Sequence, residues 1–286
     1  MPSDYPIGNG NAFTIGIILV TVLVSLWGFR NPLVMQRLIF DPEKILHEGE
    51  YYRMVSSALV HAHVPHLFLN LFSFYSFGSD IEKHFGPASL LFIYLSSIIG
   101  GSALSLLLHR NHVYRALGAS GGVCGVIFAA IFLTHTSVEF MFIPIPIPPW
   151  AFAIGFLVLS FFAMKSDSGN TAHDAHIGGA IIGLIVTAIL QPKIVFRQPG
   201  MFAAVMGISL VMLLYLIKNP LKLPLGSFIG SLRSGSREPT DRRPSPADEM
   251  RRVNEILDKI SRSGVDSLTA EEQRILDEAS RRGRPR

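Results

Sequence analysis

Cysteine and charge are scarce in this chain of 286 residues. The one cysteine, Cys124, excludes an intramolecular disulfide. Only 16% of the residues are charged and 49% are hydrophobic, whereas soluble domains carry about a quarter charged residues. Mean hydropathy is positive, at +0.39. This composition excludes an ordinary soluble domain and predicts a polytopic membrane protein.

A basic N-terminal region is also missing. Only Asp4 is charged before Ala12, and no small-residue cleavage site follows the first apolar stretch. We therefore expect this stretch to be kept in the mature protein and not removed as a signal peptide. The lack of a transit-peptide pattern favours a bacterial cytoplasmic (inner) membrane.

Seven apolar stretches approach the length that crosses a bilayer, which is about 20 residues. They lie at about 12–29, 65–77, 88–108, 120–133, 150–164, 175–190 and 201–217. The second and the fourth are short apolar cores that need polar extensions. Seven membrane helices are predicted.

The end of the chain has a different composition. Residues 1–217 contain ten Lys+Arg and ten Asp+Glu, and residues 218–286 contain fifteen and eleven, so the net charge of +4 lies in the tail. Residues 226–247 have the Ser-, Gly-, Pro- and Arg-rich composition of a flexible linker. Apolar residues at helical spacing from Met250 and a capping box at Thr269–Glu272 predict a small helical hairpin over 248–282. It could pack on itself, dock on a partner or another copy, or lie on anionic lipid.

Two polar residues open apolar stretches. Ser120 stands in Gly118-Ala119-Ser120-Gly121, and His176 follows Ala175 at the start of the sixth stretch. An ionisable group at membrane depth is energetically expensive and is a functional candidate by default. A serine framed by small residues at a helix start suggests a nucleophile.

Glycines predict that these two stretches are neighbours. The pairs Gly118/Gly122, Gly121/Gly125 and Gly179/Gly183 each have the small-xxx-small spacing that lets membrane helices approach closely. The two stretches run in the same direction, so their starts lie near one membrane face. We therefore expect Ser120 and His176 to form a dyad, with His176 as general base.

A third group opens the second stretch. Pro65 suits a first helical turn, so His66 and Asn70 share one helix face. Such donors could stabilise an oxyanion or make a polar contact between helices. His61, His63 and His66 are also spaced closely enough to share a zinc ion, but no HExxH motif and no adjacent carboxylate supports this.

Together these motifs resemble the rhomboid intramembrane serine proteases. The resemblance rests on Gly118-x-Ser120-Gly121, on Ala175-His176-x-x-Gly179-x-x-x-Gly183, and on His61-x4-His66-x3-Asn70, in the family's order. It covers residues 13–192 and implies an all-α, six-helix membrane core. Residues 198–218 resemble the added helix of "six plus one" members.

The resemblance also implies site roles and partners. Ser120 would be the nucleophile and His176 the base, with His66, Asn70 and the Ser120 backbone N–H as the oxyanion hole. A water-filled cavity would open toward one face. The expected partners are transmembrane protein substrates and membrane lipids, with no cofactor, metal or nucleic acid; the sequence does not determine the oligomeric state.

Three positions need comment against the family pattern. Tyr52-Arg53 stands where many members have Trp-Arg, and Cys124 stands where the best-known bacterial members carry a tyrosine that stacks on the catalytic histidine. Because Cys124 stands in place of that tyrosine, the support of His176 is expected to differ here. Glu82 matches a glutamate whose role in the family looks structural.

Two other classes of function compete with a protease. A catalytically inert rhomboid-like protein would bind transmembrane clients without cutting them. Loss of Ser120 or His176 would mark such a protein, and both residues are present here. A transporter or channel would show an inverted repeat or paired broken helices. The Pro interruptions at 142–150 are loop-like instead.

The topology rules disagree. If the N-terminus is cytoplasmic, as the family suggests, seven spans send the basic tail outside. The external loops would carry seven basic residues and the short cytoplasmic loops three, which opposes the positive-inside rule. The external residues are Arg30, Arg37, Lys44, Arg53, Arg110, Arg115 and Lys165; the cytoplasmic ones are Lys83, Lys193 and Arg197. The sidedness of the tail stays open at this point.

Overall fold

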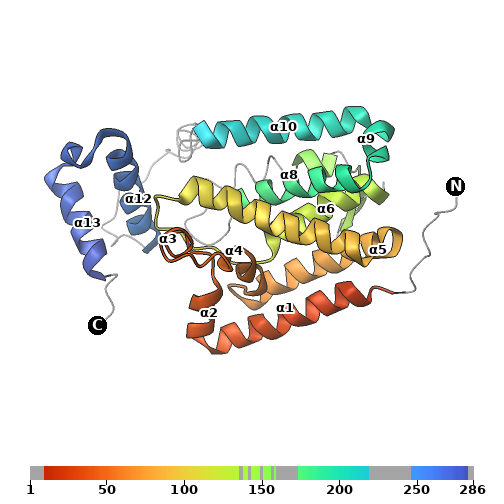
Figure 1. The fold of residues 1–286 in the computed structure, drawn as a ribbon, viewed down its shortest axis with the longest axis horizontal. Helices are drawn as coiled ribbons and strands as arrows, with labels where there is room; N and C mark the ends of the chain where they lie inside the picture. The colour runs from red at the N-terminus through yellow and green to blue at the C-terminus, as the bar shows by residue number, and fades with distance from the viewer. Residues whose placement is uncertain are drawn as a thin grey trace.

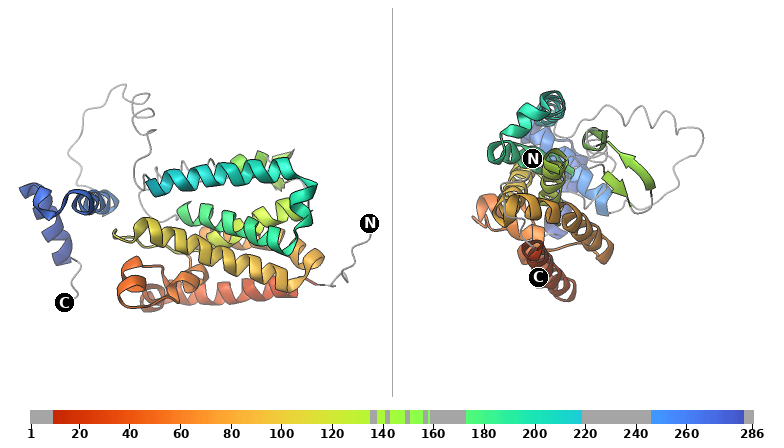
Figure 2. Two further views of the ribbon diagram at one scale, coloured as in Figure 1. Left: turned by 45° about the horizontal axis from the view of Figure 1, so that its top comes forward. Right: turned by 90° about the vertical axis from the view of Figure 1, so that its right-hand side faces the viewer.

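A computed structural model describes residues 10–134, 138–140, 143–148, 151–155, 158, 173–218 and 246–282. The chain is mostly helical, and its long helices lie side by side as a bundle in both Figure 1 and Figure 2. They are α1 (Ala12–Arg30), α5 (Val64–His109), α6 (Ser120–Thr134), α8 (His173–Leu190) and α10 (Pro199–Lys218). By length and composition α1 and α5 can cross a membrane, and α6, α8 and α10 contain shorter apolar segments.

The packing of α1 is inverted relative to a helix of a soluble protein. Its buried residues are small or polar: Thr14, Thr21, Ser25 and Gly28. Its large apolar side chains, such as Leu23 and Trp27, are 67% and 60% exposed. Small residues let helices approach each other, and large apolar side chains on the outside suit contact with lipid tails.

Helix α5 contains both the second and the third predicted stretch. Gly86, at φ 83°, is non-helical and is followed by Pro87, so two helices meet there at a kink. The predicted second stretch (65–77) is continued through the buried residues Ser79 and Glu82. This confirms that its short apolar core has a polar extension.

Glu82 caps another helix. Its carboxylate accepts hydrogen bonds from the backbone N–H groups of Phe13 (2.9 Å) and Thr14 (2.7 Å), and from the Thr14 hydroxyl (2.6 Å). The first N–H groups of a helix have no partner within it, and a carboxylate suits them in charge and geometry. Glu82 therefore joins the start of α1 to α5.

The expectation of an all-α fold is wrong at one place. Strand β1 (Val138–Phe140) pairs antiparallel with β2 (Ile143–Ile147), where we expected a loop over 142–150. The alternation Ile143-Pro144-Ile145-Pro146-Ile147 explains it, because proline cannot continue a helix while β-branched isoleucine favours an extended chain. Most of the fifth predicted stretch (150–164) lies outside the described residues. The residues of this stretch that the structure describes, 151–155 and 158, are helical.

The loop between α1 and α5 is folded into short helices: α2 (Pro32–Leu38), α3 (Pro42–His47), α4 (Arg53–Ser56) and η1 (Ser57–Leu59). Buried Arg53 holds them together. Its guanidinium donates to the carbonyls of Gln36 (2.8 Å) and Ile39 (2.9 Å) and pairs with Glu50. Hydrogen bonding to Arg53 lowers the pKa of Glu50.

The described part of the tail, residues 246–282, is mostly helical. Short helix α9 (Lys193–Arg197) precedes α10, and the tail contains α12 (Pro246–Ser263), η2 (Val265–Ser267) and α13 (Ala270–Arg282). The predicted capping box is confirmed, because the N–H of Thr269 donates to the Glu272 carboxylate at 2.7 Å and the N–H of Glu272 donates to the Thr269 hydroxyl at 3.3 Å. The linker predicted at 226–247 lies outside the described residues except for its last two, which already belong to α12.

Candidate active site

Ser120 and His176 meet at the starts of two helices. Ser120 is the first residue of α6, and His176 lies in the first turn of α8. His176 Nε2 lies 2.7 Å from Ser120 Oγ, so the hydroxyl can donate to the imidazole. The pairing of a serine hydroxyl with a histidine is the arrangement that activates a serine nucleophile.

Glycines allow this approach. A Cβ atom added at Gly179 would lie 2.0 Å from the carbonyl oxygen of Gly121, and one added at Gly183 would lie 2.4 Å from the Cα atom of Gly125. The backbones of α6 and α8 are therefore in direct contact at two successive levels, which shows that the helices are parallel. The predicted neighbourhood of these stretches is confirmed.

The third glycine pair has a different role. Gly122 packs against Tyr94 and Ile98 of α5, and Gly118 lies before α6 begins. The φ of Gly118 is +118°, a conformation that residues with a side chain rarely adopt. Gly118 therefore turns the chain into the helix that begins with Ser120.

Hydrogen bonds hold the segment before Ser120 in place. The N–H of Gly118 donates to the carbonyl of Ser57 at 2.9 Å, and the N–H of Ala119 donates to His61 Nε2 at 3.3 Å. His61 Nδ1 must then carry the proton, which it donates to Ser25 Oγ at 3.0 Å. His61 thus connects α1 to the segment that presents Ser120.

The structure brings His66 to this segment as well. A Cβ atom at Gly118 would lie 2.8 Å from His66 Cε1, so the imidazole touches the turn that leads to Ser120. Asn70 is buried one helical turn later, and its amide donates to the carbonyl of His66 at 3.0 Å. His66 is therefore next to the dyad, whereas the hydrogen bond recorded for Asn70 lies within α5.

The zinc alternative is not favoured by the histidine contacts. Both ring nitrogens of His61 are occupied as described, and His63 Nδ1 accepts the N–H of His66 at 3.1 Å as the cap of α5. Within the described part of the chain, no three His, Cys, Asp or Glu side chains are grouped as a metal site.

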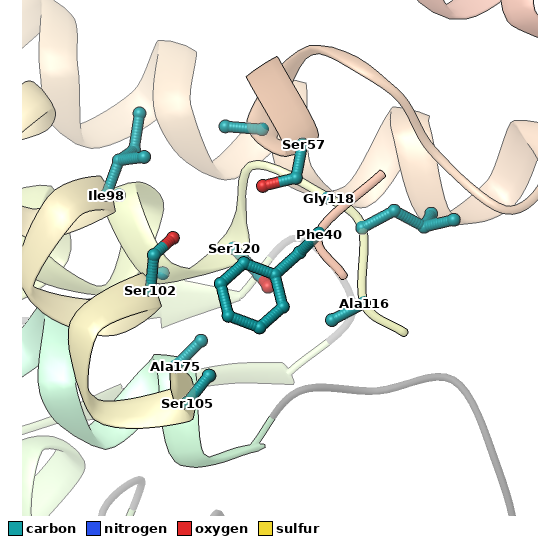
Figure 3. A pocket seen from close by; sticks show the side chains of 13 residues that line it. Phe40, Ser57, Ile98, Ser102, Ser105, Ala116, Gly118, Ser120 and Ala175 are labelled. Atoms are coloured by element: carbon teal, nitrogen blue, oxygen red, sulfur yellow. The ribbon is translucent and has the colours of Figure 1, made fainter. Parts of the chain in front are cut away.

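A small cavity adjoins Ser120. The space inside it that water can occupy is about 30 Å³, and part of the cavity is open to solvent. Phe40, Ser57, Ser102 and Ala175 line it together with Ser120, and Figure 3 shows their side chains around this space. The nucleophile therefore faces a small, partly polar space that can hold water.

A polar cluster beside the dyad was not predicted as a unit. Asp174 is buried two residues before His176, and its Oδ1 accepts the hydroxyl of Tyr114 at 3.1 Å. Its Oδ2 lies 3.3 Å from His109 Nε2, which is an ion-pair distance. This oxygen accepts no hydrogen bond from the residues that the structure describes. The rings of His109 and Tyr114 stack at 3.7 Å, and burial raises the pKa of Tyr114, as does the charge of Asp174.

The sequence contained a partial signal for this cluster. His109, His112 and Tyr114 follow one another closely in a short segment between two apolar stretches. Asp174 makes its contacts with His109 and Tyr114. Nothing local in the sequence identified those two residues as its partners.

Comparison with known proteins gives two matching families. A model described as the Rhomboid domain matches residues 48–193, and a family of unknown function (DUF6576) matches residues 247–282. The first match covers half of the chain and includes every residue of the dyad and of the expected oxyanion hole.

Relatives come from plants, yeast and bacteria. RHOMBOID-like protein 12, mitochondrial, of Arabidopsis thaliana is 28% identical over 62% of this chain and 58% of its own length. Rhomboid protease GluP of Bacillus subtilis is 29% identical over 58% of this chain and 31% of its own length, and Rhomboid protease GlpG of Photorhabdus laumondii is 28% identical over 60% and 59%. The chain thus spans less than two thirds of the length of each of these relatives.

These relatives bear on the location of the protein. The relatives include mitochondrial as well as bacterial proteins, so the prediction of a bacterial inner membrane is not supported. Membrane location itself follows from the family match and from the apolar helices. On the motifs, the fold and the family match together, the chain belongs to the rhomboid family of membrane proteins.

Proposed function

We propose that this chain is an intramembrane serine endopeptidase that cuts transmembrane segments of other proteins. The observation that carries the proposal is the 2.7 Å distance between His176 Nε2 and Ser120 Oγ. The family match and the relatives named as proteases support the same reaction class.

Acylation uses two proton transfers. His176 takes the proton of Ser120 as Oγ attacks the substrate carbonyl, and then gives it to the leaving amine; such general-base help contributes roughly 10²- to 10⁴-fold. In deacylation water takes the place of the amine: His176 removes its proton as it attacks the acyl carbonyl, and then returns a proton to Ser120 Oγ as the acid product leaves. No cofactor is required.

The oxyanion needs preorganised donors. The backbone N–H of Ser120 is available at the start of α6, where the helix dipole also favours negative charge. His66 lies against Gly118 next to it, and Asn70 would complete the set by rotating its amide away from the carbonyl of His66. Loss of one oxyanion donor costs roughly 10²- to 10³-fold in kcat.

The membrane arrangement belongs to the same proposal. The two halves of α5 would be separate spans that meet at Gly86, and with α1, α6, the predicted fifth span and α8 they would make a six-helix core over residues 13–192. Residues 198–218 would be a seventh span, 226–247 a linker and 248–282 a separate hairpin.

The test is cleavage of a single-span reporter in liposomes, with fluorophosphonate labelling in parallel. We expect the wild type to cut the reporter and to be labelled, and Ser120→Ala and His176→Ala to lose both. Cleavage that survives Ser120→Ala would refute the mechanism. A matched control, Ser76→Ala, changes an exposed serine whose hydroxyl only donates to the carbonyl of Phe72.

The alternative is an inert rhomboid-like protein that binds transmembrane clients. The observation in its favour is Cys124, which stands where a stacking tyrosine is familiar and is buried in the core of the bundle. An inert protein would retain the reporter on pull-down but would leave Ser120 unlabelled. Labelling of the wild type therefore separates the two functions.

A further inference from the structure

The tail helix α12 lies against the segment that leads to the nucleophile. Residues 110–119, which we call the pre-serine loop, connect α5 to Ser120. The N–H of Val113 donates to Asn254 Oδ1 at 3.1 Å, and the amide of Asn254 donates to the carbonyl of Val113 at 3.4 Å. One side chain of α12 thus satisfies both backbone groups of a loop residue.

A second contact lies one helical turn along α12. His112 Nε2 donates to Asp258 Oδ1 at 2.7 Å, across 146 positions of sequence. The two side chains are only 3% and 17% exposed. A charge-assisted hydrogen bond that is this well buried is screened little by water, unlike an exposed surface pair.

The other side of the pre-serine loop contacts the start of α8. Tyr114 donates to Asp174, two residues before His176, and stacks on His109 at the end of α5. The loop is therefore held between α12 on one side and the helix of the candidate base on the other. It ends at Ala119, directly before Ser120.

The docked hairpin does not fill the active-site cavity. Among the residues described as lining the cavity beside Ser120, none comes from α12 or α13. Figure 1 shows the hairpin at one end of the bundle, beyond the end of α10. An inhibitory plug would have to enter the cavity, whereas this contact supports the loop from outside.

We propose that the C-terminal hairpin is a positioning element of the active site, which docks through Asn254 and Asp258 on the pre-serine loop and holds the Ser120–His176 geometry. This inference rests on the proposed function. It also assigns the tail to the same side of the membrane as the active-site opening. Asn254, Asp258 and His112 are positioning residues and do not touch substrate.

Docking can be tested without activity. In the full chain in liposomes, with Cys124→Ala as background, Val113→Cys and Asn254→Cys should form a disulfide when copper phenanthroline is added as oxidant. The control pairs Val113→Cys with Glu278→Cys, an exposed position of α13. Equal crosslinking of the two pairs, or none in the first, would overturn the docking.

Positioning is tested by kinetics per labelled active site. Asp258→Ala and Asn254→Ala should each lower kcat about tenfold with KM within about twofold, since misplacement of reacting groups by about 1 Å costs up to roughly 10²-fold. Asp258→Glu should recover part of the loss, and Asp277→Ala, an exposed change in α13, should have no effect. The reduced Val113→Cys/Asn254→Cys protein lacks the Asn254 hydrogen bonds and should show the same loss, and formation of the disulfide should raise its kcat again.

The outcomes separate this inference from the function on which it rests. An active wild type whose kcat is unchanged by Asp258→Ala and Asn254→Ala overturns the positioning role alone. Higher activity in these variants, with loss in the locked protein, overturns it in favour of an inhibitory contact. A wild type that neither cuts nor labels overturns the proposed function and this inference together.

Discussion

Replacing Gly179 by alanine should separate the two helices that carry the dyad. The added Cβ would lie 2.0 Å from the carbonyl oxygen of Gly121, and ordinary contact begins at 3.4 Å. The obstacle is backbone, which cannot rotate away as a side chain can. Relief therefore requires α6 and α8 to move apart by about 1.4 Å, the difference between these two distances.

That movement acts directly on the dyad. Gly179 lies one turn after His176 and Gly121 directly after Ser120, so a 2.7 Å separation would open to about 4 Å, beyond the range of a hydrogen bond. We expect kcat to fall roughly 10²-fold, because a misplacement of about 1 Å is sufficient for such a loss. Overpacking should also lower the free energy of unfolding by about 1–3 kcal/mol.

The assay is cleavage of the reporter in liposomes, with the active fraction counted by fluorophosphonate. Gly207→Ala is the matched control, because a Cβ at Gly207, within α10, meets nothing within 4 Å. It should leave kcat unchanged. Wild-type kcat in Gly179→Ala, with Gly207→Ala equally active, would show that the close contact of α6 and α8 does not set the dyad geometry.

Three further changes address the scaffold and the tail. Glu82→Gln should lower the free energy of unfolding by about 2–3 kcal/mol, since an amide has one acceptor oxygen for the three donors that the carboxylate satisfies. Thermal unfolding checks this, with Glu43→Gln at an exposed position as the control. Arg53→Ala should cost about 3 kcal/mol by leaving two buried carbonyls and Glu50 without their partner, and an unchanged Tm would contradict it. The Lys259 ammonium, followed by the N–H of Thr269, holds the pKa of Glu272 at about 2, below the ordinary 4.5. Its carboxylate therefore stabilises the hairpin above pH 4.5, and this contribution is lost as the pH falls from 4.5 toward 2. Circular dichroism of the full chain should differ from that of Glu272→Gln above pH 5 and converge with it near pH 2.

Predictions from local pattern succeeded where the cause was local. The apolar stretches 12–29 and 201–217 became α1 and α10 with ends shifted by one or two residues, because an apolar segment of that length satisfies its own backbone as a helix. The capping box at Thr269 and the glycine contacts of α6 with α8 were also readable, since each depends on a fixed spacing. The hairpin of β1 and β2 was missed because its strands were interpreted only as an interruption between helices.

The sequence by itself determined the helical membrane class, the family motifs and the two residues of the candidate dyad, because hydropathy and small-residue spacing are properties of a single segment. Only the tertiary structure decided that Ser120 and His176 lie within hydrogen-bond distance, that Asp174 faces His109 and Tyr114, and that Asp258 reaches His112. Those contacts join residues that are 56 to 146 positions apart in the sequence. Such pairs are selected by how closely helices pack and where loops end, and no local pattern in the chain encodes either.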